Sequence, residues 1–129
     1  MVNDSYEKYL SAPFSYGGRG PDVFDCYGLL KQLYKEERGV EIPDFVSEDE
    51  VEKIAVLFNK GINEWEEVEE RKGVAVLFRI KGYGAHVGYC IGDGRFVHTW
   101  EKSCGVCIER LHLWRSRIIG YYDYVGIRE

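Results

Sequence analysis

The chain has 129 residues, 45% of them hydrophobic and 15% aromatic, which suffices for one domain, residues 1–129, that buries its own core. Its net charge of −5 and its scattered basic side chains argue against nucleic acid as a partner. No apolar run approaches the roughly 20 residues that cross a bilayer, and the polar start lacks the pattern of a signal peptide. The sequence therefore predicts no membrane span and no export through a signal peptide.

The first part of the chain is predicted to be helical. A short helix is expected around residues 6–10, followed by a glycine-rich loop over residues 16–22 that no regular element would tolerate. Apolar side chains then recur at helical spacing from Cys26 to about Arg38, and Gly39 follows as a stop. One face of this helix must belong to the core.

A second helix is expected after a short connection. Ser47 followed by Glu50 forms a capping box, apolar residues recur from Val51 to Phe58, and Gly61 stands beyond the predicted end.

The second half of the chain changes its period. Short segments rich in β-branched and aromatic residues predict five strands, at residues 74–78, 85–91, 95–100, 106–111 and 118–125. The acidic run 64–70 is interrupted by Trp65 and Val68, and it is interpreted as a solvated face without function. The expected fold class is α+β, with N-terminal helices packed on a C-terminal antiparallel sheet of about five strands.

The loop at residues 92–94 leaves two strand registers open. A two-residue turn at Asp93 and Gly94 would place His86 and His98 on opposite faces of the sheet. A three-residue loop would instead place Gly88 opposite His98, with His86 diagonal to it on the same face at roughly 7–8 Å between Cα atoms. In that register the two imidazoles can touch, and the missing side chain of Gly88 gives them clearance.

Cys26, His86 and His98 are candidates for a catalytic triad. A thiol at the start of a helix is easily ionised, because the helix N-terminus favours the thiolate. Histidine can take its proton and later protonate a leaving amine, and a third group must hold the tautomer of that base. The alternative is that Cys26 is a small buried hydrophobe and that both histidines are satisfied by backbone groups.

Three blocks of the sequence together resemble a known family. They run from Asp25 to Leu29, from His86 to Gly94 and from Phe96 to His98. These blocks are similar to the signature motifs of the NlpC family of cell-wall cysteine peptidases, and the glycine-rich loop precedes them in the family's order. The closing segment, residues 108–122, resembles the branch found in bacteriophage tail-tip assembly proteins.

The resemblance implies a papain-like fold in which the cysteine, at a helix N-terminus, faces a sheet that presents the histidines. It implies hydrolysis of peptidoglycan stem peptides, most often between γ-D-glutamate and a diamino acid, through an acyl-enzyme on Cys26. His86 would carry the proton, His98 would orient His86, and the backbone N–H of Cys26 would help to bind the oxyanion. No metal or organic cofactor is implied. The implied partners are the peptidoglycan peptide and possible phage tail proteins, with the protein in the cytoplasm or in a virion.

The sequence departs from the family pattern around the predicted substrate site. Phe14 stands where many members carry a tyrosine hydroxyl, and Tyr16 is the aromatic residue of the same loop that could replace it. Tyr27 stands where cell-wall members have a small serine, so it should reshape the subsite for the amino end of the stem peptide. Asp25 could receive that amino group or could act as a helix N-cap.

The departures keep two other functions open: a tail structural or assembly module with weak or lost catalysis, and a related amide or ester hydrolase or acyltransferase that uses the same triad.

The remaining cysteines are expected to be reduced and to hold no metal. Cys104 and Cys107 form a C-x-x-C unit, which is weak evidence for zinc because Cys90, His98 or His112 would have to complete the ligand set. An aromatic group could line a groove but is more often core: Trp100, Trp114, Tyr121, Tyr122 and Tyr124.

Overall fold

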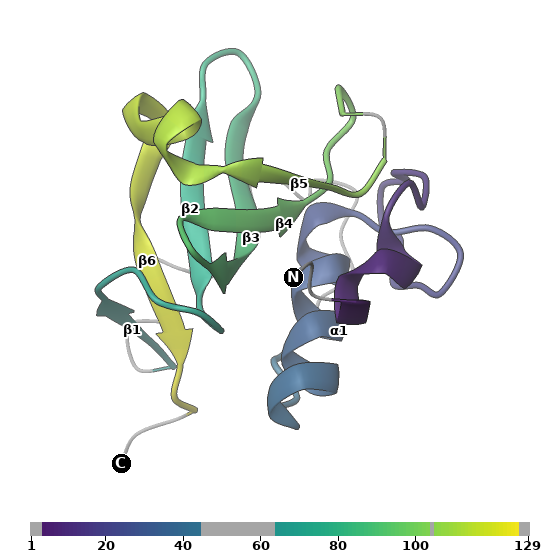
Figure 1. Cartoon of the computed structure of the whole chain (residues 1–129), viewed down its shortest axis with the longest axis horizontal. Helices are drawn as coiled ribbons and strands as arrows, with labels where there is room; N and C mark the ends of the chain where they lie inside the picture. Colours follow the sequence, from purple (N-terminus) through teal and green to yellow (C-terminus); the bar gives the residue numbers. More distant parts are fainter. Residues whose placement is uncertain (1–3, 45–63, 104, 127–129) are drawn as a thin grey trace.

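The computed structural model describes residues 4–44, 64–103 and 105–126. Within these residues, two helical segments precede the sheet, the 3-10 helix η1 (Asp4–Tyr9) and the α-helix α1 (Cys26–Arg38). The sheet contains β1 (Trp65–Val68), β2 (Ala75–Ile80), β3 (Gly84–Gly92), β4 (Arg95–His98), β5 (Cys107–Arg110) and β6 (Ile118–Tyr124) (Figure 1). The 3-10 helix η3 (Leu111–Arg117) connects β5 to β6.

Helix α1 has the bounds that the sequence predicts. Asp25 caps its N-terminus by accepting a hydrogen bond from the Gly28 backbone N–H, and Gly39 ends it in the left-handed conformation at φ 65°. The short helix expected at residues 6–10 is the 3-10 helix η1. The predicted helix between Ser47 and Gly61 lies outside the described residues.

The strands form one antiparallel sheet in the order β1-β6-β2-β3-β4-β5. The predicted α+β class and all five predicted strands are confirmed, with ends shifted by a few residues. The strand that the sequence did not predict is β1, which lies inside the acidic run and pairs with β6. Trp65 of this strand is buried while Glu66 and Glu67 are exposed, so the run is a solvated face on an edge strand.

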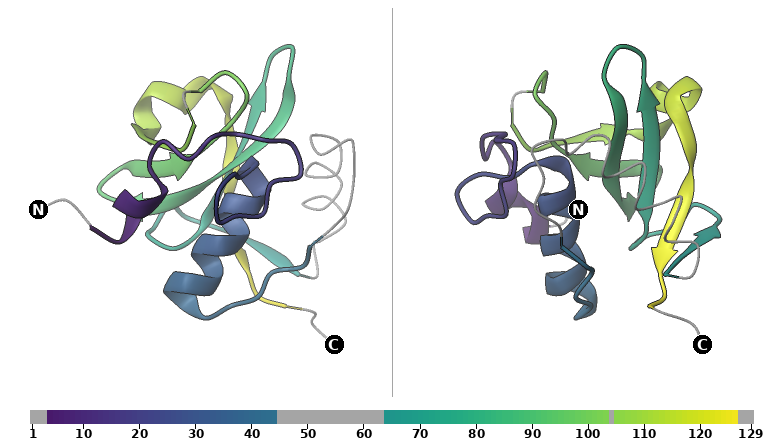
Figure 2. Two further views of the ribbon diagram at one scale, coloured as in Figure 1. Left: turned by 90° about the vertical axis from the view of Figure 1, so that its right-hand side faces the viewer. Right: turned by 180° about the vertical axis from the view of Figure 1, so that it is seen from behind.

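Helix α1 covers one face of the sheet, and η3 lies against the other (Figure 2). The first core cluster joins the buried side of α1 to Val87, Tyr89 and other side chains of the sheet. The second cluster includes Phe78, Phe96 and Trp114. Because side chains alternate along a strand, β3 contributes Val87 and Tyr89 to the first face and His86 to the second. Within the described residues, no helix combines the length and the hydrophobicity needed to span a membrane.

The hairpin of β3 and β4 contains both registers that the sequence left open. At its tip Asp93 and Gly94 have φ values of 57° and 71°, and Gly92 pairs with Arg95 across a two-residue turn. The register then shifts by one residue at Ile91, and Cys90 pairs with Phe96. This β-bulge restores the register that brings His86 and His98 to one face.

Candidate active site

Cys26 is the first residue of α1 and is 2% exposed. The preceding residue, Asp25, is fully buried and engages three groups on its side-chain carboxylate. It accepts hydrogen bonds from the backbone N–H of Gly17 at 2.9 Å and of Gly28 at 2.6 Å. It also forms an ion pair with Arg19 at 2.6 Å. The carboxylate therefore fixes the glycine-rich loop to the start of the helix that carries Cys26.

Gly28 lets the loop approach the helix closely. A Cβ atom at this position would lie 2.0 Å from the carbonyl oxygen of Gly18, which is backbone and cannot swing aside. The same Gly18 carbonyl accepts a hydrogen bond from the Asp25 N–H at 3.1 Å. A glycine at the third position of the helix is thus required by this contact rather than by the helix itself.

His86 and His98 lie together on the sheet. His86 Nε2 and His98 Nδ1 are 2.8 Å apart, and both side chains are fully buried. Phe78, Phe96 and Trp114 surround the pair, with ring centroids 4.5 Å apart for Phe96 and His98 and 5.5 Å apart for Phe78 and His86. Helix α1, which begins at Cys26, packs against the two strands that carry these histidines through the face of Val87 and Val97, whereas the imidazoles lie with Phe78 and Trp114 (Figure 1).

Glu109 extends the histidine pair and was not predicted from the sequence. Its Oε2 lies 2.6 Å from His98 Nε2, and its Oε1 accepts a hydrogen bond from the indole N–H of Trp114 at 3.1 Å. The thiol of Cys107 also approaches Oε2, at 3.7 Å. His86, His98 and Glu109 therefore form a chain of hydrogen bonds across three neighbouring strands, β3, β4 and β5.

Two groups of this series of hydrogen bonds, His86 and Glu109, have pKa values shifted from their ordinary values. Burial, and then the neighbouring His98, hold the pKa of His86 well below its ordinary value. The hydrogen bond with His98 lowers the pKa of Glu109 to about 2. Within the described part of the chain, Nδ1 of His86 is a buried nitrogen without a hydrogen-bond partner. A neutral imidazole with one unpartnered nitrogen is the form that a general base requires.

The role predicted for Gly88 needs a correction. A Cβ atom there would first meet Cδ2 of Phe96 at 2.8 Å, followed by Val76 and the backbone of Val97 at 3.3 Å. The glycine gives clearance to the Phe96 ring, which in turn packs on His98, rather than directly to the two imidazoles.

The structure places the three residues predicted to bind substrate in different surroundings. Asp25 is the N-cap, and its role toward an amino group stays a prediction, with Arg19 already paired to the carboxylate. Tyr27 is fully buried and donates its hydroxyl to the carbonyl of Pro43. Tyr16 is 53% exposed and donates its hydroxyl to Glu101 at 2.9 Å.

The cysteines outside the predicted triad have separate environments. Among the described residues, Cys26, Cys90 and Cys107 are not in a disulfide bond, and Cys104 lies outside those residues. Burial raises the pKa of Cys90 to about 12, which makes its thiol inert.

Zinc-type donors among the described residues gather at His98, Cys107 and Glu109, within 4.8 Å of one another. The 2.6 Å between His98 and Glu109 is a hydrogen-bond length, whereas two ligands of a tetrahedral zinc lie about 3.3 Å apart. We therefore assign this group to hydrogen bonding.

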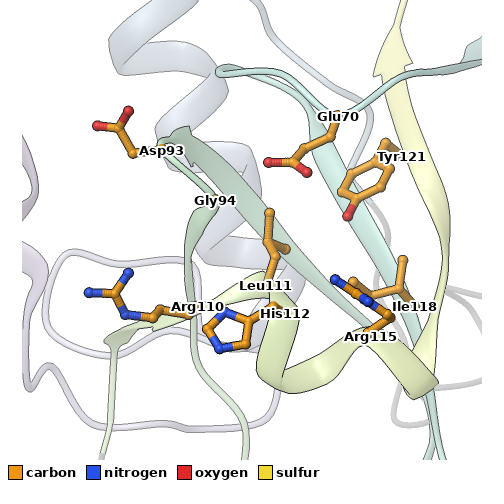
Figure 3. Close-up of a pocket in the computed structure, with 9 residues that line it drawn as sticks. All are labelled: Glu70, Asp93, Gly94, Arg110, Leu111, His112, Arg115, Ile118 and Tyr121. Carbon is orange, nitrogen blue, oxygen red and sulfur yellow. The ribbon is translucent and has the colours of Figure 1, made fainter.

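A surface hollow of about 210 Å³ lies near the tip of the β3–β4 hairpin. Asp93, Arg110 and His112 stand on one side of it, and Glu70, Arg115 and Tyr121 stand on the other (Figure 3). None of the predicted catalytic residues lines this hollow. His112, which the sequence offered as a zinc ligand, lies here among charges of both signs.

Comparison with known proteins gives one family. The model of the NlpC/P60 family matches residues 11–122. Murein DD-endopeptidase MepS/Murein LD-carboxypeptidase from Escherichia coli (strain K12) is 29% identical over 118 residues, which are 90% of this chain and 57% of that protein. Murein DD-endopeptidase MepH from the same strain is 30% identical over 116 residues, 86% of this chain and 40% of that protein. The chain thus spans about half the length of these relatives.

The fold also matches solved structures. NlpC2 from Trichomonas vaginalis superposes with a TM-score of 0.69 at 19% identity, over 94% of this chain and 45% of that one. The match supports the papain-like α+β architecture.

Proposed function

The chain belongs to the NlpC/P60 family, and from that premise we propose that it is a cysteine endopeptidase acting on the stem peptides of peptidoglycan. One observation carries the proposal: a buried two-histidine pair with one unpartnered imidazole nitrogen, on strands that pack against the helix beginning at Cys26. The E. coli relatives are named murein endopeptidases, which supports the substrate class.

In the proposed reaction Cys26 Sγ attacks the scissile carbonyl, and His86 takes the thiol proton at Nδ1. The backbone N–H of Cys26, at the positive end of α1, donates to the oxyanion. The C–N bond then breaks, His86 protonates the leaving amine, and a thioester remains on Cys26. Water, deprotonated by His86, hydrolyses the thioester to release a carboxylate and regenerate the thiol. His98 holds the ring of His86 throughout.

The bond we propose is the amide between γ-D-glutamate and the diamino acid of the stem. The names of the E. coli relatives point to a different bond, one between two D-centres. Purified monomeric and cross-linked muropeptides, incubated with the protein and followed by mass spectrometry, separate the two. Cleavage within the monomer stem supports the γ-D-glutamyl bond, whereas conversion of cross-linked dimers to intact monomers supports the other.

Cys26→Ala is the matched control for this assay. Cleavage by wild type alone supports the cysteine peptidase. If wild type leaves every muropeptide intact and Cys26 also resists a thiolate-selective alkylating reagent at neutral pH, the peptidase proposal is wrong. A reactive Cys26 without muropeptide cleavage points to the hydrolase or acyltransferase that uses another amide or ester.

We further propose that the protein works in a phage or prophage tail, in the virion or in the cytoplasm where tails assemble. The support is the resemblance of residues 108–122 to the tail-tip branch, a segment that here forms the end of β5, η3 and β6. The alternative of a tail module with weak catalysis rests on Phe14, which lacks a hydroxyl, and on the bulky Tyr27. It is also supported by Tyr16, whose hydroxyl is held by Glu101. Tail particles are purified from strains with and without this protein and tested for muropeptide cleavage. Cleavage only by particles that contain the protein supports the peptidase, whereas its presence in particles that do not cleave supports the tail module.

A further inference from the structure

The hydrogen bonds from His86 to Glu109 determine where each proton must lie. An ionised carboxylate only accepts hydrogen bonds, so the 2.6 Å contact with Glu109 requires a proton on His98 Nε2. In a neutral His98, Nδ1 is then an acceptor. The 2.8 Å contact between the two rings consequently requires the proton of His86 on Nε2. This arrangement leaves the Nδ1 lone pair of His86 available, and this is the nitrogen without a partner in the described residues.

We propose that Glu109 is a positioning residue that sets the tautomers of both histidines and thereby makes His86 Nδ1 the general base. The inference rests on the proposed function and adds to the Cys26, His86 and His98 triad a further residue that never touches substrate. Trp114 fixes the carboxylate from behind, because its indole N–H donates to the second oxygen at 3.1 Å. Trp114 is only 7% exposed, so this anchor is part of the packed core.

Glu109 also has a role in the step that moves the proton. When the Cys26 proton arrives at His86 Nδ1, the Nε2 proton of His86 can pass to Nδ1 of His98. The positive charge then lies on His98, in contact with the carboxylate, while His86 stays neutral. Full burial disfavours a charge on His86 itself, so the carboxylate offers the charge a better location.

Glu109→Gln tests the proposal sharply because the amide has one accepting atom where the carboxylate has two. If the amide oxygen accepts from Trp114, the NH₂ group faces His98 Nε2 and forces both histidines into the opposite tautomer. If the oxygen accepts from His98, two donors oppose each other at Trp114. Trp114→Phe removes this conflict, so the effect of Glu109→Gln should be smaller in the Trp114→Phe background.

The tautomers can be read without any substrate. The chain has three histidines, so ¹⁵N-labelled imidazole signals can be assigned by substitution. In Cys26→Ala at about pH 9, where histidine is neutral, we expect His86 and His98 to carry their protons on Nε2. Adding Glu109→Gln should move both protons to Nδ1 wherever the amide oxygen accepts from Trp114. A proton on His98 Nδ1 with Glu109 present would overturn the proposal.

The second test of the proposal is the catalytic rate. With Cys26 in place, Glu109→Gln should lower kcat/KM on muropeptides by at least about 10²-fold, less than the roughly 10⁴-fold that a wrong tautomer costs in a serine protease. Trp114→Phe should restore part of this loss, and Glu69→Gln, an exposed charge change, should have no effect. An unchanged kcat/KM in a variant whose tautomers have switched contradicts the proposal. If wild type cleaves no muropeptide, the proposed function fails while the spectra still decide the role of Glu109.

Discussion

The two halves of the candidate site are held by different kinds of contact. Around Cys26, a buried carboxylate binds the backbone and an arginine of one short stretch of chain, from Gly17 to Gly28. Around the histidines, three paired strands each supply one side chain, and hydrogen bonds between those side chains join them in series. The helix half is therefore a local structure whose contacts stabilise the fold. The sheet half depends on the register of segments distant in sequence, and its contacts determine which histidine nitrogen carries a proton.

This difference separates stability from activity. Removing the Asp25 carboxylate from the helix half leaves the buried N–H of Gly28 without its partner and takes one of two carboxylates from Arg19, which costs folding free energy. Removing a group in the sheet half changes which atom carries a proton, and the surrounding aromatic rings remain to hold the fold. Variants of the two halves should accordingly fail in different assays.

The largest effect is expected for His86→Gln. Loss of the base should reduce kcat/KM on muropeptides by about 10⁴-fold or more, since members of such a triad act as a unit. Its unfolding free energy should change by less than about 1.5 kcal/mol, because the side chains have similar volume. Denaturant unfolding and cleavage kinetics on one sample test both. A variant that unfolds readily would break the distinction between the halves.

Asp25→Ala is the counterpart in the helix half. Loss of the N-cap costs about 0.5–2 kcal/mol, and the unpaired N–H groups of Gly17 and Gly28 add to it, so we expect at least about 2 kcal/mol less stability by urea unfolding. Asp22→Ala, in the same loop but exposed, is the control and should stay within about 0.5 kcal/mol of wild type. Equal stability of the two variants would show that the carboxylate does not hold the loop.

Gly28→Ala should destabilise the protein by about 1–3 kcal/mol, because the new methyl group collides with the Gly18 carbonyl. The sign of this change in stability is informative. In a helix free of such a contact, the same substitution stabilises by up to about 1 kcal/mol. A raised melting temperature would therefore contradict the close seating of the loop on α1.

The smallest effect is a pH dependence of stability with two windows. The pKa of His86 is held below its ordinary value by burial, so the unfolded chain binds a proton near pH 6.5 that the folded protein does not, and stability falls as the pH drops below about 6.5. The lowered pKa of Glu109 contributes stability that is present above about pH 4.3 and is lost as the pH falls toward 2. Thermal unfolding midpoints measured between pH 8 and 3 test this. His86→Gln should abolish the loss of stability that begins near pH 6.5 and leave the loss caused by Glu109 at lower pH unchanged.

The helix half could be predicted from the sequence because its determinants are local. The helical spacing after Cys26 and the stop at Gly39 lie within a few turns of each other, and both bounds are confirmed. The N-cap role of Asp25 was one of two readings, and the structure shows that cap.

The sheet half could be predicted only in part. Spacing limited His86 and His98 to two registers, but the bulge at Ile91 combines both, and no sequence signal announced it. Glu109 was missed because its contact with His98 depends on how β5 pairs with β4 after a loop of eight residues, 99–106, that carries no hairpin signal. The pairing of His98 with Cys107 puts Glu109 two residues along on the same face, a parity argument that a known register would have allowed.

The bulge at Ile91 makes the histidine pair sensitive to the count of residues in the hairpin. Deleting that one residue would remove the bulge but keep the pairs of Gly92 with Arg95 and of Cys90 with Phe96, so the imidazoles would stay on one side of the sheet. One residue inserted between His86 and Tyr89 without a second bulge would instead turn them to opposite sides. Insertions of two residues at the tip would keep them together. The evolutionary consequence is that single-residue gaps in an alignment of functional relatives should fall at the bulge, whereas gaps within the paired stretch from His86 to Tyr89 should come in twos.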